Sequence, residues 1–108
     1  MKQTLNILGQ EYTLEYKTEE ENPKLVGNSG IAELYTKEII LNEDDMHEGK
    51  NTHSNLKEYR KEVIRHEVVH AYFHESGLSE YCRDEVLVDW IAHQLPNIVQ
   101  TLETIQYV

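Results

Sequence analysis

The stretch from Leu56 to Ser76 constrains the fold of this chain more than any other, because its inward-facing residues recur with helical spacing. They fall at intervals of three and four positions, at Leu56, Tyr59, Val63, His66, His70 and Phe73. This spacing puts all six side chains on one face of an α-helix, which the rest of the chain must cover. We therefore expect a helix over this stretch, with two histidines facing inward.

Both ends of the expected helix carry boundary signals. Asn55, with Glu58 three positions later, matches a capping box in which side chains satisfy free backbone groups, and Ser54 is the alternative cap. Gly77 follows the last turn, where glycine readily adopts the left-handed backbone that ends a helix. These signals bound the helix on both sides.

Two histidines and a glutamate form the segment His66-Glu67-Val68-Val69-His70 on this helix. At a separation of four positions both imidazoles leave the same face and can bind one metal ion. The Glu67 carboxylate lies beside them, where it can take a proton from water that the metal activates. The pattern predicts a hydrolytic zinc site with Glu67 as general base. The alternative is a pair of core histidines satisfied by hydrogen bonds, with a solvated glutamate.

A catalytic zinc needs a third protein ligand, and the next helical pattern offers two acidic residues. Apolar residues at positions 87, 88, 91, 92 and 95 predict a second helix from Ser79 to about Gln94. Glu85 and Asp89 lie one turn apart on this helix. The residues alone leave open which of the two occupies the metal.

These motifs resemble those of the gluzincin metallopeptidases, in which a helix behind HExxH carries a glutamate and, four positions later, an aspartate. Between Glu38 and Pro96, the run RHEVVHAYFHE followed by Glu-x-x-x-Asp, Ala92 and Leu95 is similar to the small ImmA/IrrE-type metallopeptidases of phages and mobile elements. The chain departs from that family in its short interval between motif and second helix, and in having no helix-turn-helix domain.

The resemblance implies a role for each matching residue. His66, His70 and Glu85 would bind zinc, and Asp89 would orient His66, since a ligating imidazole normally donates its other N–H to a carboxylate or carbonyl. It also implies a protein or peptide substrate that pairs with an edge strand of the sheet. We expect Glu38–Leu41 to be that edge strand.

The remaining candidate residues carry weaker expectations. His74 is predicted at the surface or behind the ligands. His93 either faces the cleft, where it could stabilise an oxyanion, or faces solvent. Tyr81 is the tyrosine nearest the motif in sequence, with packing as its ordinary role. His47 and His53 lie in a polar loop and are predicted to be inert.

Composition bounds the class of protein. The 108 residues suit a single domain over residues 1–108, and the net charge of −10 argues against nucleic acid or an anionic membrane as partner. Long apolar runs are absent from the sequence, so no membrane span is expected. Cys82 is the sole cysteine, which indicates a reducing compartment. We predict a cytoplasmic monomer.

The first third of the chain alternates apolar and polar residues in short runs, which predicts strands. Asn42–Asn55 is polar and predicts a loop or short helical turn, and Pro96 is expected to separate the second helix from a third over Asn97–Gln106. The fold class is therefore α+β: a small antiparallel sheet of three or four strands packed on the HExxH helix, with one or two further helices. The expected strands are Thr4–Leu8, Tyr12–Tyr16, Ile31–Tyr35 and Glu38–Leu41.

The function predicted from these features is zinc-dependent peptide-bond hydrolysis. One alternative is a catalytically silent, metal-stabilised protein-binding module of phage or mobile-element origin. Another is a metal-free interaction protein that presents its acidic surface to a basic target.

Overall fold

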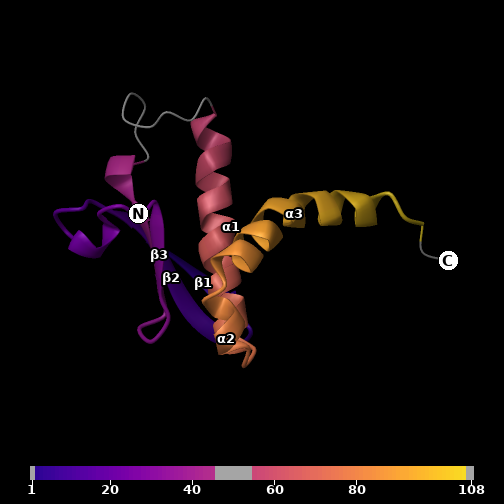
Figure 1. Ribbon diagram of the computed structural model, residues 1–108, viewed down its shortest axis with the longest axis horizontal. Helices are drawn as coiled ribbons and strands as arrows, with labels where there is room; N and C mark the ends of the chain where they lie inside the picture. Colours follow the sequence, from indigo (N-terminus) through magenta and orange to yellow (C-terminus); the bar gives the residue numbers. More distant parts are fainter. Residues whose placement is uncertain (1, 46–54, 107–108) are drawn as a thin grey trace.

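The computed structural model describes residues 2–45 and 55–106, and shows a small sheet beside a long helix (Figure 1). The predicted α+β class is confirmed. Two single-turn 3-10 helices, η1 (Pro23–Leu25) and η2 (Glu43–Asp45), lie in the connections. The strands are β1 (Gln3–Ile7), β2 (Gln10–Lys17), β3 (Gly30–Glu33) and β4 (Glu38–Asn42), and the helices are α1 (Leu56–Glu75), α2 (Ser79–Cys82) and α3 (Glu85–Glu103).

The four strands form one mixed sheet in the order β1-β2-β4-β3. The pairs β1/β2 and β3/β4 are antiparallel, as predicted for two hairpins, but β2 and β4 run parallel. The expectation of an antiparallel sheet is therefore wrong at its centre. After β2 the chain passes over one strand position and forms β3 at the edge of the sheet. Strand β4 then occupies the position between β2 and β3 and runs parallel to β2.

This order also corrects the predicted edge strand. Glu38–Leu41 belongs to β4, which lies inside the sheet, and Ile39, Ile40 and Leu41 are buried. A continuous apolar run is typical of a strand covered on both faces. In the part of the chain that the structure describes, β3 is the edge strand on that side of the sheet.

The sheet packs on α1 through a core that includes Tyr12, Leu14 and Ile39 from the strands and Val63 from the helix. At the C-terminal end of α1, polar contacts continue this interface. The Tyr12 hydroxyl donates to Glu75 Oε2 over 2.6 Å. Lys37 Nζ donates to the same oxygen over 2.7 Å. The sheet is thereby fixed to the end of the helix as well as to its middle.

The predicted boundaries of α1 are confirmed. The Asn55 side chain accepts a hydrogen bond from the Glu58 amide. Gly77 has a φ of 83°, and the Leu78 amide then donates to the Phe73 carbonyl over 2.9 Å, which closes a Schellman motif. The alternative cap Ser54 lies outside the described residues, as do His47 and His53.

The helices after α1 differ from the prediction. The expected helix from Ser79 is interrupted at Arg83, so that α2 is a single turn. Helix α3 begins at Glu85 because the Asp84 side chain caps it, accepting from the Leu87 amide over 3.0 Å. The cap therefore makes Glu85 the first residue of α3.

Pro96 does not end a helix, and this too corrects the prediction, because α3 runs through it to Glu103. A proline lacks the N–H that would bond the carbonyl four residues earlier, here that of Ala92. Arg65 of α1 fills the vacancy, since its Nε donates to the Ala92 carbonyl over 2.9 Å. The proline is tolerated because α1 satisfies the carbonyl that it leaves free.

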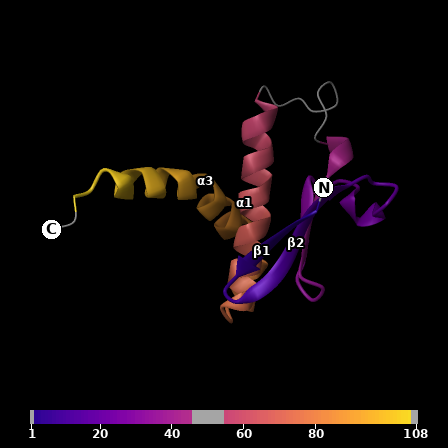
Figure 2. The ribbon, with the colours of Figure 1, turned by 180° about the vertical axis from the view of Figure 1, so that it is seen from behind.

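The C-terminal half of α3 extends away from the sheet and α1, as seen from both sides (Figures 1 and 2). The N-terminal half crosses α1 at its middle, where the motif residues lie. No helix within residues 2–45 and 55–106 has the length and apolar character needed to cross a membrane.

Candidate metal centre

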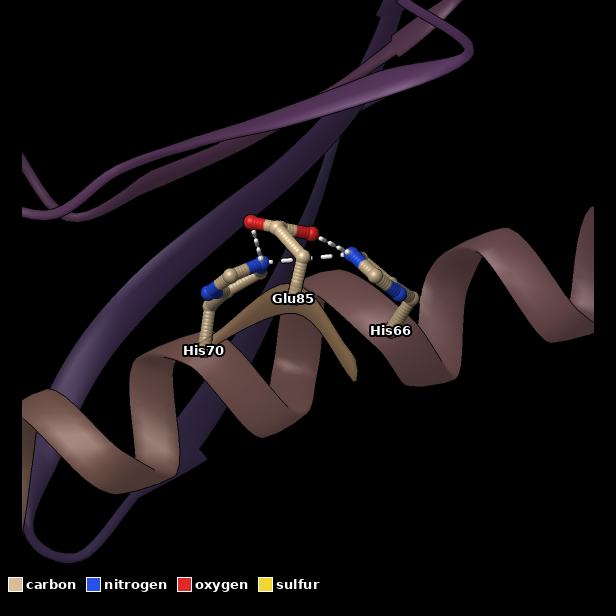
Figure 3. Close-up of side chains that lie close together, drawn as sticks. All are labelled: His66, His70 and Glu85. Atoms are coloured by element: carbon tan, nitrogen blue, oxygen red, sulfur yellow. Dashed lines mark hydrogen bonds and ion pairs between the residues drawn. The ribbon is translucent and has the colours of Figure 1, made fainter. Parts of the chain in front are cut away.

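Helices α1 and α3 bring three metal-ligating side chains to one point (Figure 3). His66 Nε2 lies 3.0 Å from Glu85 Oε2. His70 Nε2 lies 3.1 Å from Glu85 Oε1. The two Nε2 atoms are 3.2 Å apart. The structure thus groups His66, His70 and Glu85, the set that the resemblance to gluzincins implied, whereas the residues alone left Glu85 and Asp89 open.

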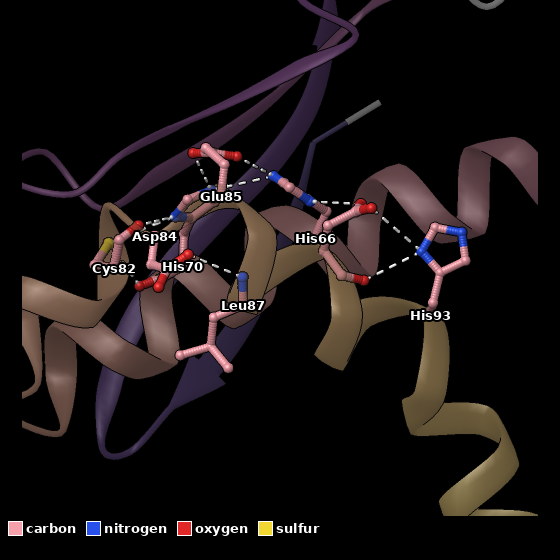
Figure 4. A network of polar contacts seen from close by, with 8 residues as sticks. His66, His70, Cys82, Asp84, Glu85, Leu87 and His93 are labelled. Carbon is pink, nitrogen blue, oxygen red and sulfur yellow. Dashed lines mark hydrogen bonds and ion pairs between the residues drawn. The ribbon is translucent and has the colours of Figure 1, made fainter.

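The outer nitrogen of each imidazole has its own partner (Figure 4). His70 Nδ1 lies 2.6 Å from the main-chain carbonyl oxygen of Cys82. His66 Nδ1 lies 3.4 Å from Asp89 Oδ1. Of the two acidic residues left open by the sequence, Glu85 faces the inner nitrogens and Asp89 faces an outer one.

These contacts determine which ring nitrogens carry protons. The Cys82 carbonyl can only accept a hydrogen bond, so His70 Nδ1 is the donor. The Asp89 carboxylate lies at ion-pair distance from His66 Nδ1 and favours the proton on that nitrogen. Burial lowers the pKa of His70, which favours its neutral ring. In neutral rings both Nε2 atoms then carry lone pairs, and these point at each other and at the Glu85 carboxylate. A metal cation between them would remove this repulsion, and so would a proton on one of the two Nε2 atoms.

The spacing of these four atoms, two imidazole nitrogens and the two oxygens of one carboxylate, suits a metal ion. In a tetrahedral zinc site with bonds of about 2.0–2.1 Å, neighbouring ligand atoms lie about 3.3–3.4 Å apart. The three separations of 3.0, 3.1 and 3.2 Å are close to this value. Two imidazoles and one carboxylate also match the ligand set of catalytic zinc sites. The residues therefore fit a zinc ion that keeps one position open.

Glu67 lies beside this group and is 6% exposed. Burial raises the pKa of Glu67 to about 7, with a smaller upward contribution from Glu85, while His66 acts in the opposite direction. A carboxylate with a pKa near neutrality can accept a proton and give it back, which is the requirement for a general base.

A cavity of about 330 Å³ opens between this group and the edge strand β3. Gly30 permits the close approach of strand and helix, since an added Cβ would lie 2.9 Å from Val63 Cγ1 and 3.2 Å from Glu67 Cγ. The cavity is lined by Asn28, Gly30, Ile31, Ala32, Leu34, His66, Glu67, His70 and Glu85.

The other predicted candidates lie elsewhere. The His74 ring makes an edge contact with Tyr35, at 6.1 Å between centroids. Tyr81 packs near Phe73 and does not line the cavity. His93 lies outside this cavity, on the far side of Asp89, and borders an open groove along α3.

Sequence reasoning missed two supports of the centre. The first is Cys82, which the sequence marks only as a sole cysteine, and whose thiol donates to the His70 carbonyl with Sγ and oxygen 3.3 Å apart. Its main-chain carbonyl nevertheless holds the His70 ring, and no residue pattern signals a main-chain contact. The second is Gly30, and the signal that could mark it in the sequence is a glycine directly before an expected strand, where a backbone can approach closely.

In comparisons with protein-family models, curated proteins and solved structures, no match to this chain was found.

Proposed function

We propose that this chain is a zinc-dependent metallopeptidase of the HExxH type. The observation that carries the proposal is the convergence of three lone-pair donors beside a buried carboxylate and an open cavity. His66, His70 and Glu85 would hold the metal, and Asp89 and the Cys82 carbonyl would orient the two rings.

Zinc bound there would act as a Lewis acid toward the substrate carbonyl and would lower the pKa of water. Glu67 accepts the proton of the attacking water at a carboxylate oxygen and then delivers it to the leaving amine. Its position under β3 shields that oxygen from bulk solvent. Glu85 is 67% exposed at its side chain, so the centre is reachable by a large substrate.

We propose protein or peptide as substrate because the cavity lies along an edge strand. The outer side of β3 has no neighbouring strand among the described residues. An extended peptide can add to such an edge through backbone hydrogen bonds, which tolerate varied side chains. We further propose a cytoplasmic monomer, which accords with a single, unpaired cysteine and a net charge of −10.

The decisive experiment compares wild type with Glu67→Gln in protein purified without a histidine tag. We expect about one equivalent of tightly bound zinc in both proteins, and cleavage of a proteome-derived peptide library by wild type alone. General acid–base catalysis typically contributes about 10²–10⁴-fold to the rate, so the variant should lose at least that factor. Glu58→Gln, at the exposed start of α1, is the matched control.

Two outcomes would overturn the proposal. Wild-type protein that binds zinc but cleaves no peptide would favour the silent, metal-stabilised binding module. Protein that binds no zinc after exposure to excess metal would favour the metal-free interaction protein.

A further inference from the structure

A second group of metal-ligating side chains lies one helical turn further along the contact between α1 and α3. Glu62 precedes His66 by four positions on α1, and Asp89 and His93 follow Glu85 by four and eight positions on α3. One ligand atom from each of Glu62, Asp89 and His93 lies within 4.8 Å of the other two. The crossing that assembles the first group therefore assembles a second beside it.

The contacts of His93 orient one of its nitrogens toward this group. His93 Nδ1 lies 3.1 Å from the main-chain carbonyl oxygen of Asp89, which can only accept, so Nδ1 carries a proton. His93 Nε2 lies 3.0 Å from Glu62 Oε1. In a neutral ring this places a lone pair opposite a carboxylate, the same arrangement of acceptors that marks the first centre.

We propose that Glu62, Asp89 and His93 form a second site for a divalent cation. It lies next to the proposed catalytic site and takes no part in the proposed hydrolysis. Two carboxylates and one imidazole suit Zn²⁺, and their two negative charges balance the ion. Asp89 lies between the two groups, because its Oδ1 is 3.4 Å from His66 Nδ1 and its Oδ2 is 3.6 Å from the protonated Nδ1 of His93. To bind the ion, an Asp89 oxygen would leave this contact with the N–H and join His93 Nε2 and Glu62 around the metal.

Exposure sets the order in which the sites fill. The two sites differ in their imidazoles, because the side chain of His93 is 50% exposed, against 20% and 12% for His66 and His70. Their carboxylates do not separate them, since Glu85 of the first site is 67% exposed. Water competes more strongly for exposed ligands, so the second site binds more weakly. A groove of about 670 Å³, lined in part by Trp90, gives an ion direct access from solvent.

The test is a calorimetric titration of the tag-free, chelator-treated full chain with Zn²⁺. We expect two steps, a tight one and a weaker one, with a final ratio of two ions per chain. His93→Ala and the near-isosteric Glu62→Gln should each remove the weak step and keep the tight one. His70→Ala should weaken the tight step and keep the weak one. His74→Ala, another histidine of the same chain, should keep both.

The alternative is a protonated His93 that bridges two carboxylates without metal. It gives a single step in wild type, with no change in stoichiometry on replacing His93, and that result overturns the proposal. Two steps that both persist in His93→Ala and in Glu62→Gln overturn it as well. Circular dichroism of each variant confirms folding, and Glu62→Gln keeps the test valid if His93→Ala unfolds. Peptide cleavage, measured separately, tests the first centre alone.

Discussion

The two halves of the proposed catalytic centre are built differently. The His70 half is held by a main-chain atom, the Cys82 carbonyl, at 2.6 Å. The His66 half is held by a side chain, the exposed carboxylate of Asp89, at 3.4 Å. A main-chain support persists whatever residue occupies the position, whereas a side-chain support can be removed by one substitution. We therefore expect the His70 half to be rigid and the His66 half to be adjustable.

Removal of either ligand is expected to have the largest effect. His66→Ala and His70→Ala each delete a proposed metal ligand. Loss of an outer partner typically costs about 10–100-fold in affinity, so each of these variants should lower zinc affinity by more than that. Competition with a chromophoric chelator measures this. Retention of wild-type affinity in either variant would remove that histidine from the ligand set, and His74→Ala provides the baseline.

The next prediction separates the two kinds of support. Asp89→Ala should lower the affinity of the tight site by about 10–100-fold, because His66 loses its orienting partner. Cys82→Ala should leave that affinity unchanged, since the carbonyl remains. The same chelator competition applies to both. Equal losses in the two variants would contradict the distinction between the halves.

A smaller effect is expected where α3 is tied to α1 beside His66. Arg65→Met keeps an apolar stem but leaves the buried Ala92 carbonyl without its side-chain donor, which costs about 1–3 kcal/mol. Pro96→Ala restores an N–H that can reach the same carbonyl. Urea denaturation should therefore show a smaller cost of Arg65→Met in the Pro96→Ala background. An unchanged cost would mean that Arg65 acts through packing alone.

The smallest effect is expected at the end of α1, away from both histidines. Hydrogen bonds from Lys37 and then Tyr12 hold the pKa of Glu75 below its ordinary value. A carboxyl whose pKa is lowered by folding stabilises the fold above its unfolded pKa, and this contribution disappears as the pH falls through the folded pKa.

Glu75→Gln should accordingly be less stable than wild type near neutral pH. The difference should begin to shrink as the pH falls to the ordinary glutamate pKa of 4.5, and should vanish below the lowered pKa of Glu75 in the folded protein. Urea denaturation at a series of pH values measures it. Zinc affinity at neutral pH should not change, which makes this variant a control for the two halves of the centre. A difference that grows toward acid pH would reverse the assigned sign.

Local signals in the sequence predicted the parts of this molecule that local interactions determine. Asn55 and Gly77 bound α1 through bonds to residues a few positions away, and the four-residue spacing alone puts His66 and His70 on one face. The choice between Glu85 and Asp89 was left open because it depends on where α3 crosses α1. That crossing is fixed by contacts between distant residues.

The errors in the prediction have the same origin. The hairpins follow from alternation, but the parallel pairing of β2 with β4 depends on where the second hairpin docks. Pro96 lies inside a helix only because Arg65, distant in sequence, satisfies the Ala92 carbonyl. Neither the β2–β4 pairing nor the Arg65–Ala92 hydrogen bond can be predicted from a local pattern in the sequence.

Gly30 determines how closely β3 approaches α1. The strand above the motif helix meets Val63 and Glu67 through a backbone that carries no side chain at that point, so even one methyl group would collide with the helix. The separation between β3 and Glu67, the proposed general base, is therefore set at this position by the hydrogen atoms of Gly30. A single added carbon would force the strand or the side chains beneath it to shift.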